Sequence, residues 1–155
     1  MELSDILAKH AVLTCTGMTS KRQLFELLAD KSAELTGLDR TDILAAIVGR
    51  EELGSTGLGN GIAIPHGKLA GLKGVVAVFA RLDHPIDFDA VDDQAVDLVM
   101  MLLAPVGAGA DHLKALSSVA RMLRTEDIID QLRHETEAER LYAILSQPLE
   151  GNYAA

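Results

Sequence analysis

A glycine-rich stretch that leads into a histidine and a lysine contains the residues most suited to chemistry. Residues 54–68, GSTGLGNGIAIPHGK, include five glycines, one proline and one histidine. A Walker A phosphate loop would need a glycine five positions before Gly67 and a serine or threonine directly after Lys68, and both are missing. The three central glycines are spaced by two after an expected helix, which does not fit the G-x-G-x-x-G dinucleotide fingerprint. The stretch is therefore either an ordinary glycine-rich turn or a segment whose backbone closely approaches a partner.

His66 lies between Pro65 and Gly67, a setting that suits a histidine with one reactive ring nitrogen. Proline fixes its own φ and favours an extended conformation for the residue before it, here Ile64. Gly67 would allow another chain to come close to the imidazole. One ring nitrogen can then be presented for reaction while a local hydrogen bond orients the other. A surface histidine without a chemical role is the alternative reading of the same residues.

Cations and a second histidine are placed where they could assist phosphoryl transfer to His66. Such transfer needs positioning and cationic groups for the phosphoryl oxygens, and little else from the protein. Arg50 and Lys68 are near His66 in the sequence. His112 opens the segment DHLKALS and could fold back onto the site, or it could be a surface histidine at a helix N-terminus. We expect no chemical role for the other three histidines, His10, His84 and His134.

The composition restricts the class of protein and of partner. The chain has 155 residues, of which 48% are hydrophobic, so we expect one domain over residues 1–155, with residues 146–155 as a loose tail. A net charge of −9 and an aromatic content of 3% argue against nucleic acid. The charge favours a basic protein partner or serves solubility alone. No apolar run is long enough for a bilayer and the N-terminus is not a signal peptide, so we expect no membrane insertion and a cytoplasmic location.

Several other chemistries lack their motifs. The single cysteine, Cys15, excludes an internal disulfide and a cysteine-cage metal site, and no H-E-x-x-H motif is present. Ser55 lies in G-S-T-G rather than G-x-S-x-G, which argues against a serine nucleophile. The aspartates between residues 83 and 93 lack the spacing of a calcium loop. We therefore expect neither a metal nor a cofactor.

Hydrophobic periodicity and end signals predict helices and strands within one α/β or α+β domain. We expect strands over residues 11–17, 74–82 and 95–105, and helices over residues 19–37, 39–53, 109–124, 125–135 and 136–146. The expected capping residues are Thr19 or Ser20, Gly37, Asp39, and a capping box of Thr136 with Glu139. Residues 83–94 contain Pro85 and five aspartates and are expected to be a connection.

The segment REELGSTGLGNGIAIPHGKL, residues 50–69, resembles the active-site stretch of enzyme IIA of the bacterial phosphotransferase system. More narrowly, it resembles the nitrogen-regulatory type of that family, which is related to the fructose and mannitol IIA domains. Three further segments are similar and follow in the family's order: TSKRQLFELLA (19–29), PIDFDAVDDQAVDLVMMLLAP (85–105) and HLKALSSVARMLR (112–124). Leu58, Asp93 and Ala95 depart from the family pattern, and none of them belongs to the expected phosphoryl site.

The resemblance implies both a fold and a site. The implied fold is α/β, a single domain with a mixed β-sheet flanked by helices on both sides. His66 is implied to be the phosphorylated residue, a tele-phosphohistidine that carries the phosphoryl group on Nε2 while a hydrogen bond holds Nδ1. His112 is implied to face His66 across the site, and Arg50 to lie beside both. The implied donor is an HPr-like phosphocarrier protein, which enzyme I charges from phosphoenolpyruvate.

The use of the phosphoryl group stays open at this point. We expect a phosphoacceptor of the nitrogen-related phosphotransferase system with a mainly regulatory role, which binds targets such as sensor kinases or potassium transport components in one phosphorylation state. The alternative is a sugar-specific IIA component that passes phosphate to a IIB domain, although Cys15 is not in a IIB-like setting. A phosphate-independent interaction module is a second alternative, which would be expected to have lost His66.

Overall fold

Two long apolar strands form the centre of the sheet in the computed structural model, which describes residues 2–147. Strand β5 (Val76–Ile86) pairs antiparallel with β6 (Val96–Pro105), and the middle of both strands is buried on both faces. The run over 95–105 therefore forms a strand, as its nearly continuous apolar character indicated. The expected connection over 83–94 was partly wrong, because β5 continues through Pro85 to Ile86. Ile86 pairs with Val96 after an irregularity in the register, which is where a strand tolerates proline.

The first strand begins earlier than the sequence predicted. Strand β1 covers Leu7–Cys15 and pairs parallel with β5, whereas the predicted strand covered residues 11–17. Residues 8–10 are exposed and the register shifts between Leu7 and Val12, so the apolar alternation that marks a strand is missing at this end. A 3-10 turn, η1 (Leu3–Asp5), precedes the strand.

The glycine-rich stretch contributes three short strands to one side of β6. They are β2 (Gly57–Gly59), β3 (Ile62–Ala63) and β4 (His66–Leu69). Both β3 and β4 run parallel to β6, with Ile62 opposite Leu98 and His66 opposite Leu102, while β2 pairs antiparallel with β3. The sheet order is β1-β5-β6-β3-β2, with β4 also on β6. The result is a mixed sheet of six strands, as the resemblance implied.

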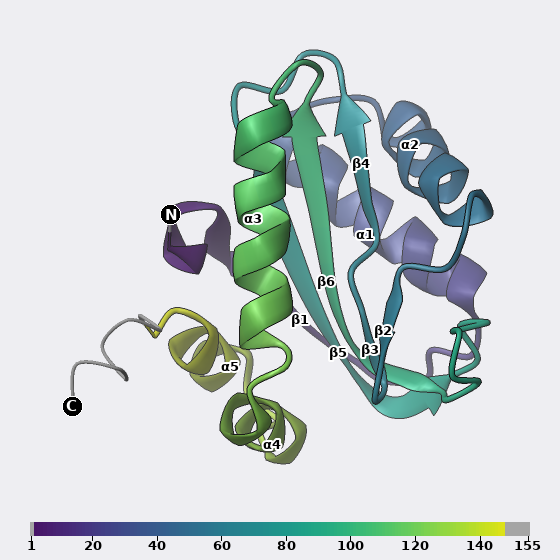
Figure 1. Ribbon diagram of the computed structural model, residues 1–155, viewed down its shortest axis with the longest axis vertical. Coiled ribbons are helices and arrows are strands. Elements are labelled where there is room, and N and C mark those ends of the chain that lie inside the picture. The colour runs from purple at the N-terminus through teal and green to yellow at the C-terminus, as the bar shows by residue number, and fades with distance from the viewer. Residues whose placement is uncertain (1, 148–155) are drawn as a thin grey trace.

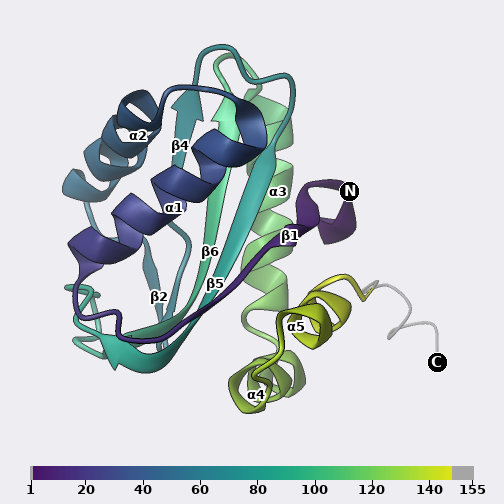
Figure 2. The same cartoon turned by 180° about the vertical axis from the view of Figure 1, so that it is seen from behind.

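Helices cover both faces of this sheet. Helices α1 (Lys21–Thr36) and α2 (Arg40–Glu52) lie on one face, and α3 (Gly109–Met122) crosses the other, as the two opposite views in Figures 1 and 2 show. Helices α4 (Glu126–His134) and α5 (Ala138–Leu145) follow α3, and α5 packs against β1. The implied fold class is therefore confirmed. Within residues 2–147 no helix is both long enough and apolar enough to cross a bilayer.

The capping residues were predicted correctly for the first two helices only. Ser20 Oγ accepts a hydrogen bond from the Gln23 amide, Gly37 ends α1 with a positive φ, and Asp39 caps α2. The predicted capping box at Thr136 is wrong. Helix α5 begins at Ala138, and the Thr136 amide donates to the Glu135 carboxylate instead, so the preceding turn uses the group that a capping box would need. The expected loose tail lies outside the described residues from residue 148 onward.

Candidate functional site

His66 is held at the start of β4 with one ring nitrogen engaged and the other available. Pro65 has no amide hydrogen, but its carbonyl accepts from the Leu102 amide at 2.9 Å, so the chain stays attached to β6 at the point where it enters β4. The half-buried His66 ring places Nδ1 2.8 Å from the Ile64 carbonyl oxygen. A carbonyl oxygen can only accept, so Nδ1 carries the proton and the lone pair is on Nε2.

The surroundings of His66 favour the neutral imidazole. Burial lowers the pKa of His66 below its ordinary value of 6.5, and the positive charge of Arg50 lowers it further. The hydrogen bond to Ile64 and the negative charge of Glu51 oppose this shift without reversing it. His66 is therefore neutral near pH 7, the form in which Nε2 acts as a nucleophile.

Helix α3 brings His112 to His66 from the other face of the sheet. The two imidazole rings have their centroids 5.5 Å apart and meet edge to face at 75°. His112 is only 7% exposed, and within residues 2–147 its Nε2 is the one buried side-chain polar atom without a hydrogen-bond partner. Burial, followed by the nearby His66 and the charge of Lys68, lowers the pKa of His112. The structure thus places a buried ring nitrogen of His112 beside the imidazole of His66.

Arg50 and His66 line one hollow of about 280 Å³, which we call the histidine hollow. Its other lining residues come from the segment after α2 and from α3: Ser55, Thr56, Gly57, Leu58, Ile64, Leu116 and Ala120. Arg50 lies in the last turn of α2 and donates from Nη1 to the Gly54 carbonyl at 2.9 Å. Lys68 is exposed on β4 and acts on His112 through its charge. The histidines without an expected role, His10, His84 and His134, are exposed and do not line the hollow.

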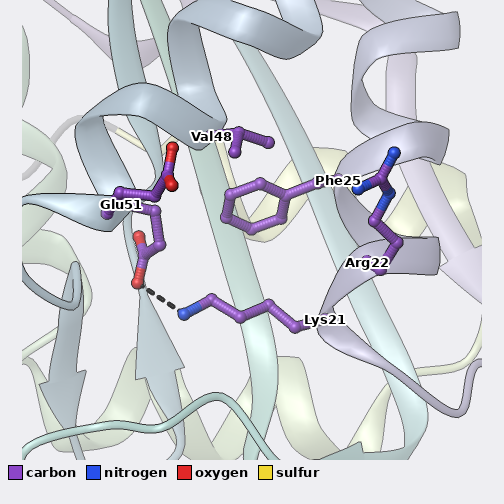
Figure 3. Close-up of a pocket in the computed structure, with 6 residues that line it drawn as sticks. Lys21, Arg22, Phe25, Val48 and Glu51 are labelled. Atoms are coloured by element: carbon purple, nitrogen blue, oxygen red, sulfur yellow. Dashed lines mark ion pairs between the residues drawn. The ribbon is translucent and has the colours of Figure 1, made fainter.

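The sequence analysis did not predict a role for Glu51, a buried carboxylate that binds Thr56 in the wall of the histidine hollow. Glu51 is 9% exposed, accepts hydrogen bonds from the Thr56 amide and hydroxyl, and pairs with Lys21 Nζ at 2.9 Å. Figure 3 shows this ion pair beside a second hollow between α1 and α2, with the ring of Phe25 between the two helices. A carboxylate in the last turn of a helix opposes the helix dipole. That mismatch is the signal in the sequence that could have found Glu51.

Gly67 has a different role from the predicted one. It is buried under α2, and a Cβ at this position would lie 3.1–3.2 Å from the backbone carbon, the oxygen and the Cβ of Ala46. The glycine therefore admits a helix of the same chain. The expectation that Gly67 gives another chain access to the imidazole is wrong, because α2 already occupies that side of β4.

Replacing Gly67 by alanine is expected to destabilise the fold. The added methyl group must push α2 away from β4, and overpacking of this kind costs about 1–3 kcal/mol. Urea unfolding monitored by circular dichroism measures the loss, with Gly74→Ala as the control because a Cβ at Gly74 meets nothing within 4 Å. Equal unfolding midpoints for the two variants would show that α2 can move away from the added methyl group without loss of stability.

The sequence and the fold together place the chain in a known family. The family model of the phosphoenolpyruvate-dependent sugar phosphotransferase system, EIIA 2, matches residues 5–147. The chain belongs to this family. A nitrogen regulatory protein of Bradyrhizobium diazoefficiens is 49% identical over 148 residues, covering 96% of this chain and 97% of the relative. Within the family the chain is therefore of the nitrogen-regulatory type, as the resemblance predicted.

Two further comparisons agree with this assignment. A nitrogen regulatory protein of Klebsiella oxytoca is 39% identical over 155 residues, covering 99% of this chain and 96% of the relative. The crystal structure of the nitrogen regulatory protein IIA-Ntr from Neisseria meningitidis superposes with a TM-score of 0.86 at 36% identity, covering 92% of this chain and 98% of the other. The shared fold therefore extends over nearly the whole length of both chains.

Proposed function

We propose that this chain is a phosphoacceptor of the nitrogen-related phosphotransferase system and that His66 is the residue phosphorylated. One observation carries the proposal: the Ile64 carbonyl engages Nδ1 of His66, so that Nε2 is the unprotonated nitrogen, beside the buried and unpartnered Nε2 of His112. The proposed donor is the phosphohistidine of an HPr-like phosphocarrier. The proposed compartment is the cytoplasm.

The transfer balances as an exchange of one nitrogen–phosphorus bond for another. The lone pair of His66 Nε2 attacks phosphorus, and the bond between phosphorus and the donor imidazole breaks with its electron pair on the donor nitrogen. His66 keeps its proton on Nδ1, where the Ile64 carbonyl stabilises the positive charge that develops on the ring. The product is a tele-phosphohistidine, and no metal or cofactor takes part in the step.

Two further residues are proposed to contact the phosphoryl group. An N–H at Nε2 of His112 would donate to a phosphoryl oxygen and so gain the partner that this buried atom lacks. Arg50 would supply a cation and planar donors for the remaining oxygens after leaving the Gly54 carbonyl. Two leucines near site residues in the sequence are exposed, Leu53 after α2 at 84% and Leu113 on α3 at 67%. Exposed apolar side chains of this kind suit a docking protein.

The regulatory role is proposed in preference to sugar transport. Its support is the likeness to nitrogen regulatory proteins over nearly their whole length. The proposed output is the binding of target proteins, such as sensor kinases or potassium transport components, in one phosphorylation state. Mixing the phosphorylated chain with sugar-specific IIB domains distinguishes the regulatory role from sugar transport. Slow or absent phosphoryl transfer is expected, and rapid transfer to any IIB domain would favour the transport alternative.

Phosphorylation itself is tested by reconstitution. Phosphoenolpyruvate, enzyme I and the phosphocarrier together are expected to add about 80 Da to the chain, the mass of one phosphoryl group. The added mass should disappear on mild acid treatment, because a phosphoramidate is acid-labile. A chain whose mass stays unchanged under conditions that phosphorylate a known IIA domain would contradict the proposal and favour the phosphate-independent alternative.

The lowered histidine pKa values predict that the fold loses stability in mild acid. Burial lowers the pKa of His66 and of His112 below 6.5, so the unfolded chain binds protons before the folded chain does. The free energy of unfolding is therefore expected to hold above about pH 6.5 and to decrease as the pH falls below it. Urea unfolding between pH 7.5 and pH 5 measures this, with His112→Gln as the comparison. Equal pH dependence of the wild type and His112→Gln would exclude a contribution from His112.

A further inference from the structure

A continuous series of hydrogen bonds joins α1 to the imidazole of His66. Lys21 Nζ lies 2.9 Å from a carboxylate oxygen of Glu51, and the Thr56 amide lies 3.1 Å from the same carboxylate. The Thr56 carbonyl accepts from the Ile64 amide at 3.0 Å. The Ile64 carbonyl in turn accepts from Nδ1 of His66 at 2.8 Å. Ile64, whose carbonyl fixes the proton of His66, is thus held by Thr56. Thr56 is in turn held by Glu51.

The Glu51 carboxylate is placed where stability alone would not place it. It is buried, which costs free energy for a charged group, and it lies in the last turn of α2, where the helix dipole disfavours a negative charge. Its compensation comes from the Thr56 amide and hydroxyl and from the Lys21 ammonium group. These bonds fix the segment that leaves α2 and forms a wall of the histidine hollow.

Lys21 holds the Glu51 carboxylate from helix α1. Its ammonium group also donates to the Phe88 carbonyl at 2.9 Å and lies 4.3 Å from the centre of the Phe88 ring. Phe88 is fully buried in the segment after β5. The ion pair therefore connects three parts of the chain, and Figure 3 shows the Lys21 and Glu51 side chains meeting beside the hollow between α1 and α2. These contacts restrict the movement of Glu51 and of the Thr56 backbone that it binds.

We infer that Glu51 is a positioning residue for phosphoryl transfer, acting through Thr56 and Ile64 to hold Nε2 of His66 unprotonated and in line with the incoming phosphorus. The inference rests on the proposed function. Glu51 does not touch the phosphoryl group.

The test compares Glu51→Gln with Glu52→Gln, which removes the same charge from the next residue of the same helix at an exposed position. In Glu51→Gln the side chain loses its negative charge and one acceptor oxygen, which weakens its bonds to the Thr56 amide and to the Lys21 ammonium group. We expect the transfer rate at saturating phosphocarrier to fall about tenfold or more, because small displacements of reacting groups are costly. The half-saturating concentration of phosphocarrier should stay within about twofold, since Glu51 is buried and offers little surface to a docking protein. Glu52→Gln should match the wild type, and equal rates for the two variants would overturn the inference.

The tautomer of His66 gives a second readout that needs no phosphate. Long-range proton–nitrogen NMR of the unphosphorylated protein should show the proton on Nδ1 in the wild type and in Glu52→Gln, and a new population with the proton on Nε2 in Glu51→Gln. An unchanged tautomer in Glu51→Gln would overturn the positioning role by itself. A wild-type chain that takes no phosphoryl group would instead overturn the proposed function, so the two failures are distinguishable.

A variant pair at Thr56 covers the case in which Glu51→Gln does not fold. Thr56→Ser keeps the hydroxyl group that donates to Glu51, and Thr56→Val keeps the shape but loses it. The transfer rate of Thr56→Ser should stay within about twofold of the wild type, and that of Thr56→Val should fall several-fold. Equal rates for the two Thr56 variants would contradict the inference.

Discussion

A His66→Ala chain is expected to take no phosphoryl group from the phosphocarrier, while its fold stays intact. The proposed acceptor atom is removed outright, so the loss should be complete rather than partial. His112 is not expected to replace it, because in the proposed mechanism its Nε2 carries a proton that is donated to the phosphoryl group and has no free lone pair. Intact-protein mass spectrometry after incubation with phosphoenolpyruvate, enzyme I and the phosphocarrier measures the outcome.

The matched control for this variant is His134→Ala. His134 is an exposed histidine on α4, away from the histidine hollow, so its removal should leave the phosphorylated fraction unchanged. A His66→Ala chain that still gained the full mass of one phosphoryl group would assign the acceptor to another residue. A His134→Ala chain that gained no phosphoryl mass would likewise assign the acceptor to a residue other than His66.

Arg50→Ala is expected to slow phosphorylation of His66 about 100-fold or more. A preorganised charged donor aimed at developing charge typically contributes this much to a transfer rate. Arg50 lines the same hollow as His66, and its positive charge lowers the pKa of His66, so we expect the guanidinium to contact a phosphoryl group on Nε2. Rapid-quench measurement of the rate at saturating phosphocarrier gives the effect directly.

Two comparison variants identify what Arg50 contributes. Arg50→Lys keeps the charge and loses the planar pair of donors, so an intermediate rate is expected. Arg22→Ala removes an exposed arginine from α1, where it pairs with Glu26, and should leave the rate unchanged. Unchanged kinetics in Arg50→Ala would remove Arg50 from the proposed mechanism.

Local signals in the sequence were sufficient for the elements that end in clear caps or contain long apolar runs. Ser20, Gly37 and Asp39 act as predicted because a cap depends only on residues within one helical turn. Strand β6 was predictable because burial on both faces leaves an apolar run in the sequence. These parts of the fold follow from short-range chemistry.

The short strands of the glycine-rich stretch could not be predicted in this way. Strands β2, β3 and β4 have two to four residues each, and β3 and β4 exist because β6 supplies hydrogen-bonding partners from far along the chain. The contact of Gly67 with Ala46 depends in the same way on the docking of α2. The short strands and the contact of Gly67 with Ala46 both depend on tertiary contacts, which a local sequence pattern does not predict.

The candidate site was predictable to a different extent for each residue. The resemblance implied that Arg50 and His112 lie near His66, and the structure brings all three together, although their roles stay predictions. Glu51 was missed because its role depends on Lys21 and Thr56, which reach it from another helix and from the following loop. The charge mismatch in the last turn of α2 marks Glu51 and Glu52 alike, and only the folded contacts with Lys21 and Thr56 distinguish Glu51.

The central claim is that Nε2 of His66 carries the phosphoryl group, because the Ile64 carbonyl occupies Nδ1. Nitrogen-15 labelled protein, phosphorylated by the phosphocarrier and observed by proton–nitrogen NMR with phosphorus coupling, tests this claim most directly. We predict one coupled ring nitrogen, Nε2 of His66, with the proton still on Nδ1. Coupling at Nδ1 of His66, or at any nitrogen of His112, would contradict the account.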